Sequence, residues 1–201
     1  MSAPAARGTP RAEAQRERIL CAAQQCFIDH GFHAASMASI AATAQMSAGL
    51  MYRYFASKNA IVLAIVERQL QEGRAQVARL HTSADLSAAI FDTYAKWQAR
   101  DPSVVSPALL LEMSAEATRD PQIAAALSQS DDRIFADLQS WMVRDRVHGG
   151  LGLPSDTAAR RTFLLECFIN GLAMSAARQP ERDPEPMRQV IASFVERLLT
   201  P

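Results

Sequence analysis

The stretch SMASIAATAQMSAGLMYRYFASK, residues 36–58, reads as two short helices joined by a tight turn. The hydroxyl of Ser36 can cap the first helix, because a serine side chain accepts from the unpaired amides of a first helical turn. One face of that helix is apolar at helical spacing and carries Met37, Ile40, Ala41 and Ala44. Gln45 and Met46 form the corner, and Ser47 can cap the second helix. A helix-turn-helix is therefore predicted.

The second helix has the side chains that a DNA recognition helix needs. Ala48 and Gly49 are small, so its N-terminal end could approach base edges in the major groove. Hydroxyl and cationic donors suited to phosphate oxygens stand at its far end. The predicted DNA-binding residues are Ser36, Met37, Ser47, Ala48, Gly49, Leu50, Tyr52, Arg53, Tyr54 and Lys58. The alternative is that two short amphipathic helices only form a small core.

The run Gly49-Leu50-Met51-Tyr52-Arg53-Tyr54-Phe55-Ala56-Ser57-Lys58 resembles the end of the recognition helix in the TetR family of bacterial transcriptional repressors. The resemblance covers roughly residues 11 to 66 and includes a helix ending at His30-Gly31-Phe32. Leu50 departs from the family, which often has threonine there, and Ala48 is also apolar. Specificity is therefore expected from methyl contacts or DNA shape more than from hydrogen bonds to bases.

The composition of the 201 residues predicts an all-α protein, because alternating β-branched runs are missing. No apolar run reaches the roughly 20 residues that cross a bilayer, and the N-terminus lacks the apolar core of a secretory signal. Three cysteines without metal-ligand spacing favour a reduced, cytoplasmic location. Residues 1–60 hold six basic and three acidic side chains, whereas the other 141 residues have an excess of acidic side chains. This asymmetry is typical of a protein that turns one face toward a polyanion.

Three segments are expected along the chain. Residues 1–10 form a disordered arm from which Arg7, with Arg11, could reach DNA, although a solvated tail is the simpler interpretation. Residues 11–60 form the helix-turn-helix domain, whose first helix spans about 11–30 and stops at Gly31. A connector helix at 58–80 leads to a body at 83–201, and its polar second half is either part of a tilting rod or a solvated surface.

The body is expected to hold helices at about 84–100, 103–119, 120–148, 155–177 and 187–198, giving about nine in the chain. The last two form an αα-hairpin that could double into a four-helix bundle. The resemblance implies dimerisation there, with Phe163, Leu164, Cys167, Phe168, Gly171, Val190 and Phe194 at the interface. The alternative is that both apolar stripes are buried within one monomer.

Aromatic and methionine side chains are frequent in the middle helices, as in ligand pockets. The predicted ligand-binding residues are Phe91, Tyr94, Trp97, Met113, Glu116, Phe135, Leu138, Trp141 and Met142. Glu116 could anchor a cationic ligand, or it could be solvated or paired with a nearby arginine. Each aromatic side chain could instead be ordinary core.

Catalysis is not expected, because the four histidines are scattered and no phosphate-binding loop is present. No cofactor, metal or membrane is predicted as a partner. The sequence favours a homodimeric repressor that binds a palindromic DNA operator and is released by a small apolar or amphipathic effector. The alternatives are a non-specific architectural DNA protein, a small-molecule-binding helical bundle, and an activator of the same architecture.

Overall fold

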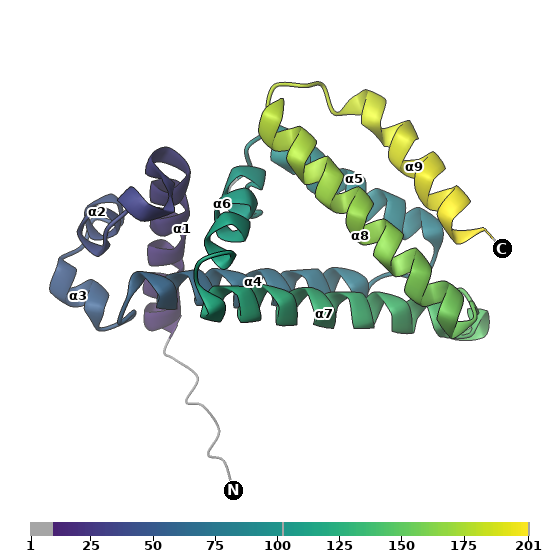
Figure 1. Ribbon diagram of the computed structural model, residues 1–201, viewed down its shortest axis with the longest axis horizontal. Helices are drawn as coiled ribbons and strands as arrows, with labels where there is room; N and C mark the ends of the chain where they lie inside the picture. Colours follow the sequence, from purple (N-terminus) through teal and green to yellow (C-terminus); the bar gives the residue numbers. More distant parts are fainter. Residues whose placement is uncertain (1–9, 102, 201) are drawn as a thin grey trace, which may run out of the picture. The chain divides into compact units, whose positions relative to one another are not determined.

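The computed structural model describes residues 10–101 and 103–200, and in this part of the chain all regular secondary structure is helical, without strands (Figure 1). It contains nine α-helices and one short 3₁₀ helix, which confirms the all-α prediction. The predicted arm, with Arg7, lies outside the described residues except for Pro10, which begins the first helix. The chain divides into two compact units, one ending at Ile65 and the other beginning at Val66.

The first unit consists of α1 (Pro10–Ala34), α2 (Met37–Thr43), α3 (Ala48–Tyr52) and the beginning of α4 (Lys58–Val77). Gly31 interrupts α1 with φ 76° and ψ 162°, a conformation that residues with a Cβ rarely adopt. The main helix therefore stops where the sequence predicted. α1 packs on α2 and α2 on α3, around a core that includes Ile19, Phe27, Ile40, Met51 and Ile61.

The second unit contains the rest of α4 and five further helices, with a 3₁₀ helix after the third of them. These elements are α5 (Ser83–Gln98), α6 (Pro107–Ala117), α7 (Pro121–Val143), η1 (Arg146–His148), α8 (Ser155–Arg178) and α9 (Glu185–Leu199). α5 packs on α8 and α9, and α7 packs on α6 and α8. Their inward faces form one apolar core around fully buried residues such as Tyr94, Trp141, Leu165 and Val195.

Two predicted boundaries in the body were wrong. α6 begins at Pro107 and not near Ser103, because Ser106 caps it by accepting from the Leu109 amide at 3.2 Å. α7 ends at Val143 and does not reach His148. A Cβ on Gly150 would collide with the Arg144 carbonyl, so this glycine allows the chain after α7 to fold back closely on itself.

None of the described helices has both the length and the hydropathy required to cross a membrane.

Candidate nucleic-acid interface and internal cavity

Serine caps define both helices of the predicted helix-turn-helix. Ser36 accepts from the Ser39 amide at 3.0 Å, and the Ser39 hydroxyl accepts from the Ser36 amide at 2.9 Å, which completes a capping box. Ser47 accepts from the Leu50 amide at 3.2 Å. Between the helices, Gln45 has a φ of 51° and turns the chain. The corner therefore lies where the sequence placed it.

The short helix α3 has one buried and one outward face. Met51 is fully buried and Phe55, just after the helix, is 4% exposed, so these two apolar side chains hold α3 on the core of the unit. Ser47, Ala48, Gly49 and Arg53 are exposed, and Tyr52 is 55% exposed. The residues predicted to contact DNA thus include a contiguous outward group.

The predicted residues Met37, Leu50 and Tyr54 are partly buried. Ser36 is exposed, but its hydroxyl is used in the capping box. A Cβ built on Gly49 would meet no described heavy atom within 4 Å. Packing within the described part of the chain therefore gives no reason for a glycine at this exposed position.

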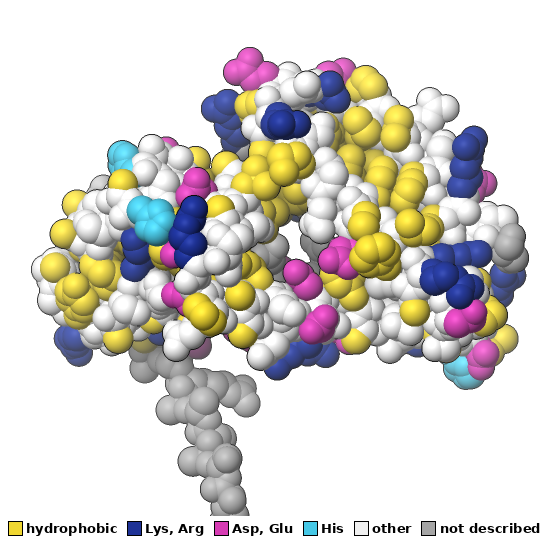
Figure 2. Space-filling model, in the orientation of Figure 1, with side chains coloured by type: hydrophobic (Ala, Val, Ile, Leu, Met, Phe, Trp, Pro, Cys, Tyr) yellow, Lys and Arg dark blue, Asp and Glu magenta, His cyan; other side chains and the backbone are white. Residues whose placement is uncertain are grey.

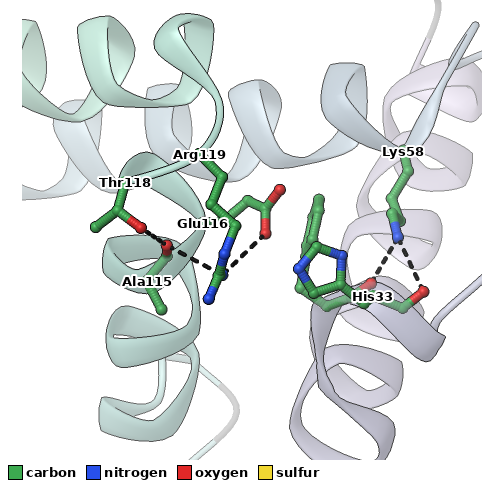
Figure 3. A network of polar contacts seen from close by, with 7 residues as sticks. His33, Lys58, Ala115, Glu116, Thr118 and Arg119 are labelled. Atoms are coloured by element: carbon green, nitrogen blue, oxygen red, sulfur yellow. Dashed lines mark hydrogen bonds and ion pairs between the residues drawn. The ribbon is translucent and has the colours of Figure 1, made fainter.

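Lys58 also makes contacts within the chain that the sequence interpretation did not predict. Its ammonium donates to the carbonyl oxygens of Phe32 at 2.6 Å and Ala35 at 3.0 Å, and it lies 4.2 Å from the centre of the Phe32 ring. Figure 3 shows Lys58 beside His33, whose carbonyl oxygen lies 3.5 Å from the ammonium. The carbonyls at a helix C-terminus are unpaired and attract cations. Lys58 therefore ties the start of α4 to the end of α1 and to the loop before α2.

Arg16 is a functional candidate that the sequence interpretation missed. Its guanidinium donates to the Tyr54 carbonyl oxygen at 3.2 Å and lies 4.4 Å from the centre of the Phe55 ring. Arg16 thus connects α1 to the segment that follows α3. A basic residue about four turns before Gly31 gave no signal of this contact, because the contact depends on tertiary packing.

The second unit encloses a cavity of about 220 Å³ between α4, α5, α7 and α8, with the loop before α6 closing one side. Its walls are mainly aliphatic. Trp97 and Leu138, both predicted to bind ligand, line it. Six lining positions were not assigned to a ligand by the sequence interpretation: five on α4, namely Gln69, Glu72, Gly73, Gln76 and Val77, and Leu80 just beyond the helix. The polar second half of the connector thus faces a cavity on one side.

The other seven predicted ligand residues do not line this cavity. Phe91, Tyr94, Trp141 and Met142 are packed in the core of the unit, and Phe135 packs against it. Several have partners there: the Arg188 guanidinium lies 3.7 Å from the centre of the Phe91 ring, and the Trp141 indole donates to the Gly149 carbonyl at 3.1 Å. Met113 and Glu116 are buried on α6, and Glu116 forms an ion pair with Arg119 at 3.9 Å (Figure 3).

Five of the seven predicted dimer residues are exposed on the outer faces of α8 and α9, and the other two, Phe168 and Phe194, are partly buried. Phe163 is 63% exposed, Leu164 52% and Val190 51%, and Cys167 and Gly171 are also exposed. Hydrophobic side chains gather over this region in Figure 2. Phe168 and Phe194 stack between the helices with ring centres 3.8 Å apart.

A separate set of residues fills the core of the monomer, and it includes Leu165 and Leu172 on α8 and Ile191 and Val195 on α9. The apolar stripes of these two helices are therefore not fully buried within one described chain.

Asp131 on α7 is an acidic group near α8 whose titration is shifted. Burial of its carboxyl group, followed by the nearby charges of Glu166 and Asp132, raises the pKa of Asp131 to about 6, although the residue as a whole stays exposed. The folded chain therefore disfavours the ionised form of this carboxyl group.

Two family models match the chain. Residues 19–65 match the family described as bacterial regulatory proteins, tetR family, and residues 84–200 match the C-terminal part of BetI-type transcriptional repressors. The chain is 30% identical over 194 residues to the HTH-type transcriptional regulator UidR of Escherichia coli K12, covering 94% of this chain and 95% of UidR.

Two further likenesses concern the whole fold and the first unit. The solved structure of Salmonella enterica GusR superposes with a TM-score of 0.74 at 25% identity, covering 92% of this chain and 95% of GusR. The transcriptional activator FasR of Mycolicibacterium smegmatis is 41% identical over 61 residues, which is 30% of this chain and 27% of FasR.

Proposed function

The chain belongs to the tetR family of bacterial regulatory proteins, and from this premise we propose that it is a transcriptional repressor that binds a palindromic operator as a homodimer and is released by a small effector. The observation that carries the proposal is the outward face of α3. A core-anchored helix there presents small residues at one end and an exposed Tyr52 and Arg53 at the other. It would act in the cytoplasm, on the chromosome.

The side chains of that face are suited to binding the DNA backbone, and they can make few hydrogen bonds to the bases. The Tyr52 hydroxyl and the Arg53 guanidinium are donors for phosphate oxygens, which fix a protein on the duplex. Ala48 and Gly49 are exposed and short, so base edges could come close to the helix backbone. Sequence preference would then come from methyl contacts by Ala48 and Leu50 and from groove shape.

A second copy of the chain is the proposed occupant of the outer faces of α8 and α9. Three large apolar side chains there are more than half exposed, and Gly171 leaves room for a neighbouring helix because its missing Cβ would touch nothing described within 4 Å. Contiguous apolar surface of this kind marks an association site. Two recognition helices held about 34–36 Å apart would match two half-sites of an operator.

Effector binding in the cavity would be coupled to operator binding through α4. Gln69, Glu72, Gly73 and Gln76 line it from α4, and the same continuous helix begins at Lys58, which holds the end of α1. A ligand that displaces this helix would alter the state of the first unit without contacting it. A coupling of about 1–3 kcal/mol is enough to release the operator.

The proposal is tested by fluorescence anisotropy on labelled duplexes from the region upstream of the coding gene, with scrambled duplexes as controls. We expect specific binding by a dimer and an affinity that falls steeply with salt, because phosphate contacts release counterions. Equal affinity for the natural and scrambled duplexes would instead indicate an architectural DNA protein.

Activation of transcription is the second candidate, and the match of the first unit to the activator FasR favours it. The sign of regulation is read by deleting the gene and measuring transcripts of its operator-linked neighbours. A repressor predicts that they rise, whereas an activator predicts that they fall.

A further inference from the structure

The cavity between α4, α5, α7 and α8 has a chemistry that selects among effectors. This inference rests on the proposed function, because it concerns the same effector site. We propose that the cavity binds a mainly apolar molecule of about the size of a substituted benzene, with an uncharged or cationic polar end, and that it rejects carboxylates of the same skeleton.

The expected size of the ligand follows from the volume of the cavity and from the residues that line it. At about 220 Å³ the cavity is larger than the engineered cavity of about 150 Å³ that takes up benzene. Aliphatic side chains from α5, α7 and α8, among them Ile90, Leu138 and Leu172, form its walls. One aromatic ring with a short chain would fill this space and replace contacts that the empty cavity lacks.

The charge selectivity follows from the ionisable side chain in the lining. Among the described residues that line the cavity, Glu72 is the one with a carboxyl group, and no lysine or arginine joins it. Arg68, one helical turn away and outside the lining, forms an ion pair with Glu72 at 3.7 Å, and the Glu72 side chain is 47% exposed. A ligand carboxylate would lose part of its hydration and meet Glu72, while the cation beside the lining, Arg68, already pairs with Glu72. Burial of a charge without its own partner is strongly disfavoured.

The polar groups of the cavity are arranged along one edge. Gln69, Glu72 and Gln76 follow one another at helical spacing on α4. The Thr93 hydroxyl and the Trp97 indole already donate to the carbonyls of Ala89 and Val105, each at 3.0 Å. The α4 edge thus presents two amide groups and the carboxylate of the Arg68–Glu72 ion pair. A carboxylate can accept from a hydroxyl or an ammonium but not from an ionised acid.

Three compounds that share one skeleton test the selectivity: 4-phenylbutan-1-ol, 4-phenylbutan-1-amine and 4-phenylbutanoate. The full-length chain has two tryptophans, and Trp97 lines the cavity whereas Trp141 does not. The Trp141→Phe variant therefore reports cavity occupancy through Trp97 fluorescence, and Trp97→Phe is the matched control that should give no signal. Thermal shift of the unsubstituted protein provides a second reading if either variant folds poorly.

We expect the alcohol or the amine to bind at least about tenfold more tightly than the acid. Glu72→Gln should weaken the amine, leave the alcohol unchanged and improve the acid. The proposal is overturned if the acid binds within tenfold of the better of the other two, if none of the three binds, or if Glu72→Gln leaves the ratio of amine to acid affinity unchanged.

Binding is measured without DNA, so its outcome is independent of the regulator function. The same compounds are then added to the operator complex. Occupancy of the cavity without release of DNA would contradict the effector role and leave the ligand selectivity intact, whereas failure of the chain to bind any operator would contradict the proposed function alone.

Discussion

Replacement of Lys58 by methionine separates a positioning role from a phosphate contact. Methionine keeps most of the length of the apolar stem and its contact with the Phe32 ring, but it removes the ammonium that donates to the Phe32 and Ala35 carbonyls. If Lys58 holds the end of α1, the variant should lose stability. If it grips DNA, the variant should lose a counterion-releasing contact.

The structure sets the expected size of the effect. A hydrogen bond to a charged group contributes about 1.5–3 kcal/mol, and an exposed cation–π contact about 0.5–1 kcal/mol. Lys58 is partly exposed, so water can replace part of this interaction when the ammonium is removed. We therefore expect a loss of about 2 kcal/mol, which corresponds to a fall in melting temperature of about 4–8 °C for a chain of this length.

The assay combines melting with the salt dependence of operator binding. Each lost phosphate contact lowers the slope of log K against log salt by about 0.9, and a homodimer loses two, so a phosphate-contacting residue should lower it by about 1.8. Arg53→Gln is the matched control, because Arg53 is exposed beside the recognition helix. We expect Lys58→Met to melt at a lower temperature with an unchanged salt slope. Arg53→Gln should keep the melting temperature of the unsubstituted chain and lower the salt slope by about 1.8. A Lys58→Met variant with normal melting and a slope lowered by about 1.8 would refute the positioning role.

Three further substitutions test other parts of the molecule. Leu164→Asp, on the exposed face of α8, should produce a folded monomer in sedimentation, and a dimer of unchanged affinity would contradict the proposed interface. Tyr52→Phe should weaken operator binding by about 1 kcal/mol per half-site and equally for related sequences, as expected for a lost phosphate hydrogen bond. Because the pKa of Asp131 is raised to about 6 from an ordinary 3.8, its stabilising contribution is present at low pH and is lost as the pH rises through 6. Asp131→Asn should therefore melt at a higher temperature than the unsubstituted chain at pH 7.5, and this difference in melting temperature should become smaller toward pH 4. A difference that does not depend on pH would argue against this titration.

Local signals in the sequence were sufficient for most of the first unit. Ser36 and Ser47 cap their helices within three residues, and Gly31 adopts a backbone conformation that favours glycine, so each can be recognised without knowledge of the tertiary structure. Lys58 and Arg16 could not be assigned in this way. Their partners lie 26 and 38 residues away, and only the packed unit brings them together.

In the body, even fewer of the site residues could be assigned from the sequence alone. Spacing predicted that Phe91, Trp97 and Trp141 are apolar helix positions, but it could not tell which of them faces space and which faces a neighbour. Only Trp97 of the three lines the cavity. The polar half of α4 was expected to belong either to a tilting rod or to a solvated surface. Gln69 and Gln76 line the cavity instead, and no local pattern indicated this, because the helices that enclose the cavity with α4 are distant in sequence.

The most direct test of the central claim is a hydroxyl-radical footprint of the purified chain on its upstream DNA. We predict two protected half-sites related by a two-fold axis, with centres about 10–10.5 base pairs or a multiple of that apart, and loss of both when Leu164→Asp separates the dimer. A single protected half-site, or protection that follows no sequence, would contradict a dimeric repressor that reads a palindrome through α3.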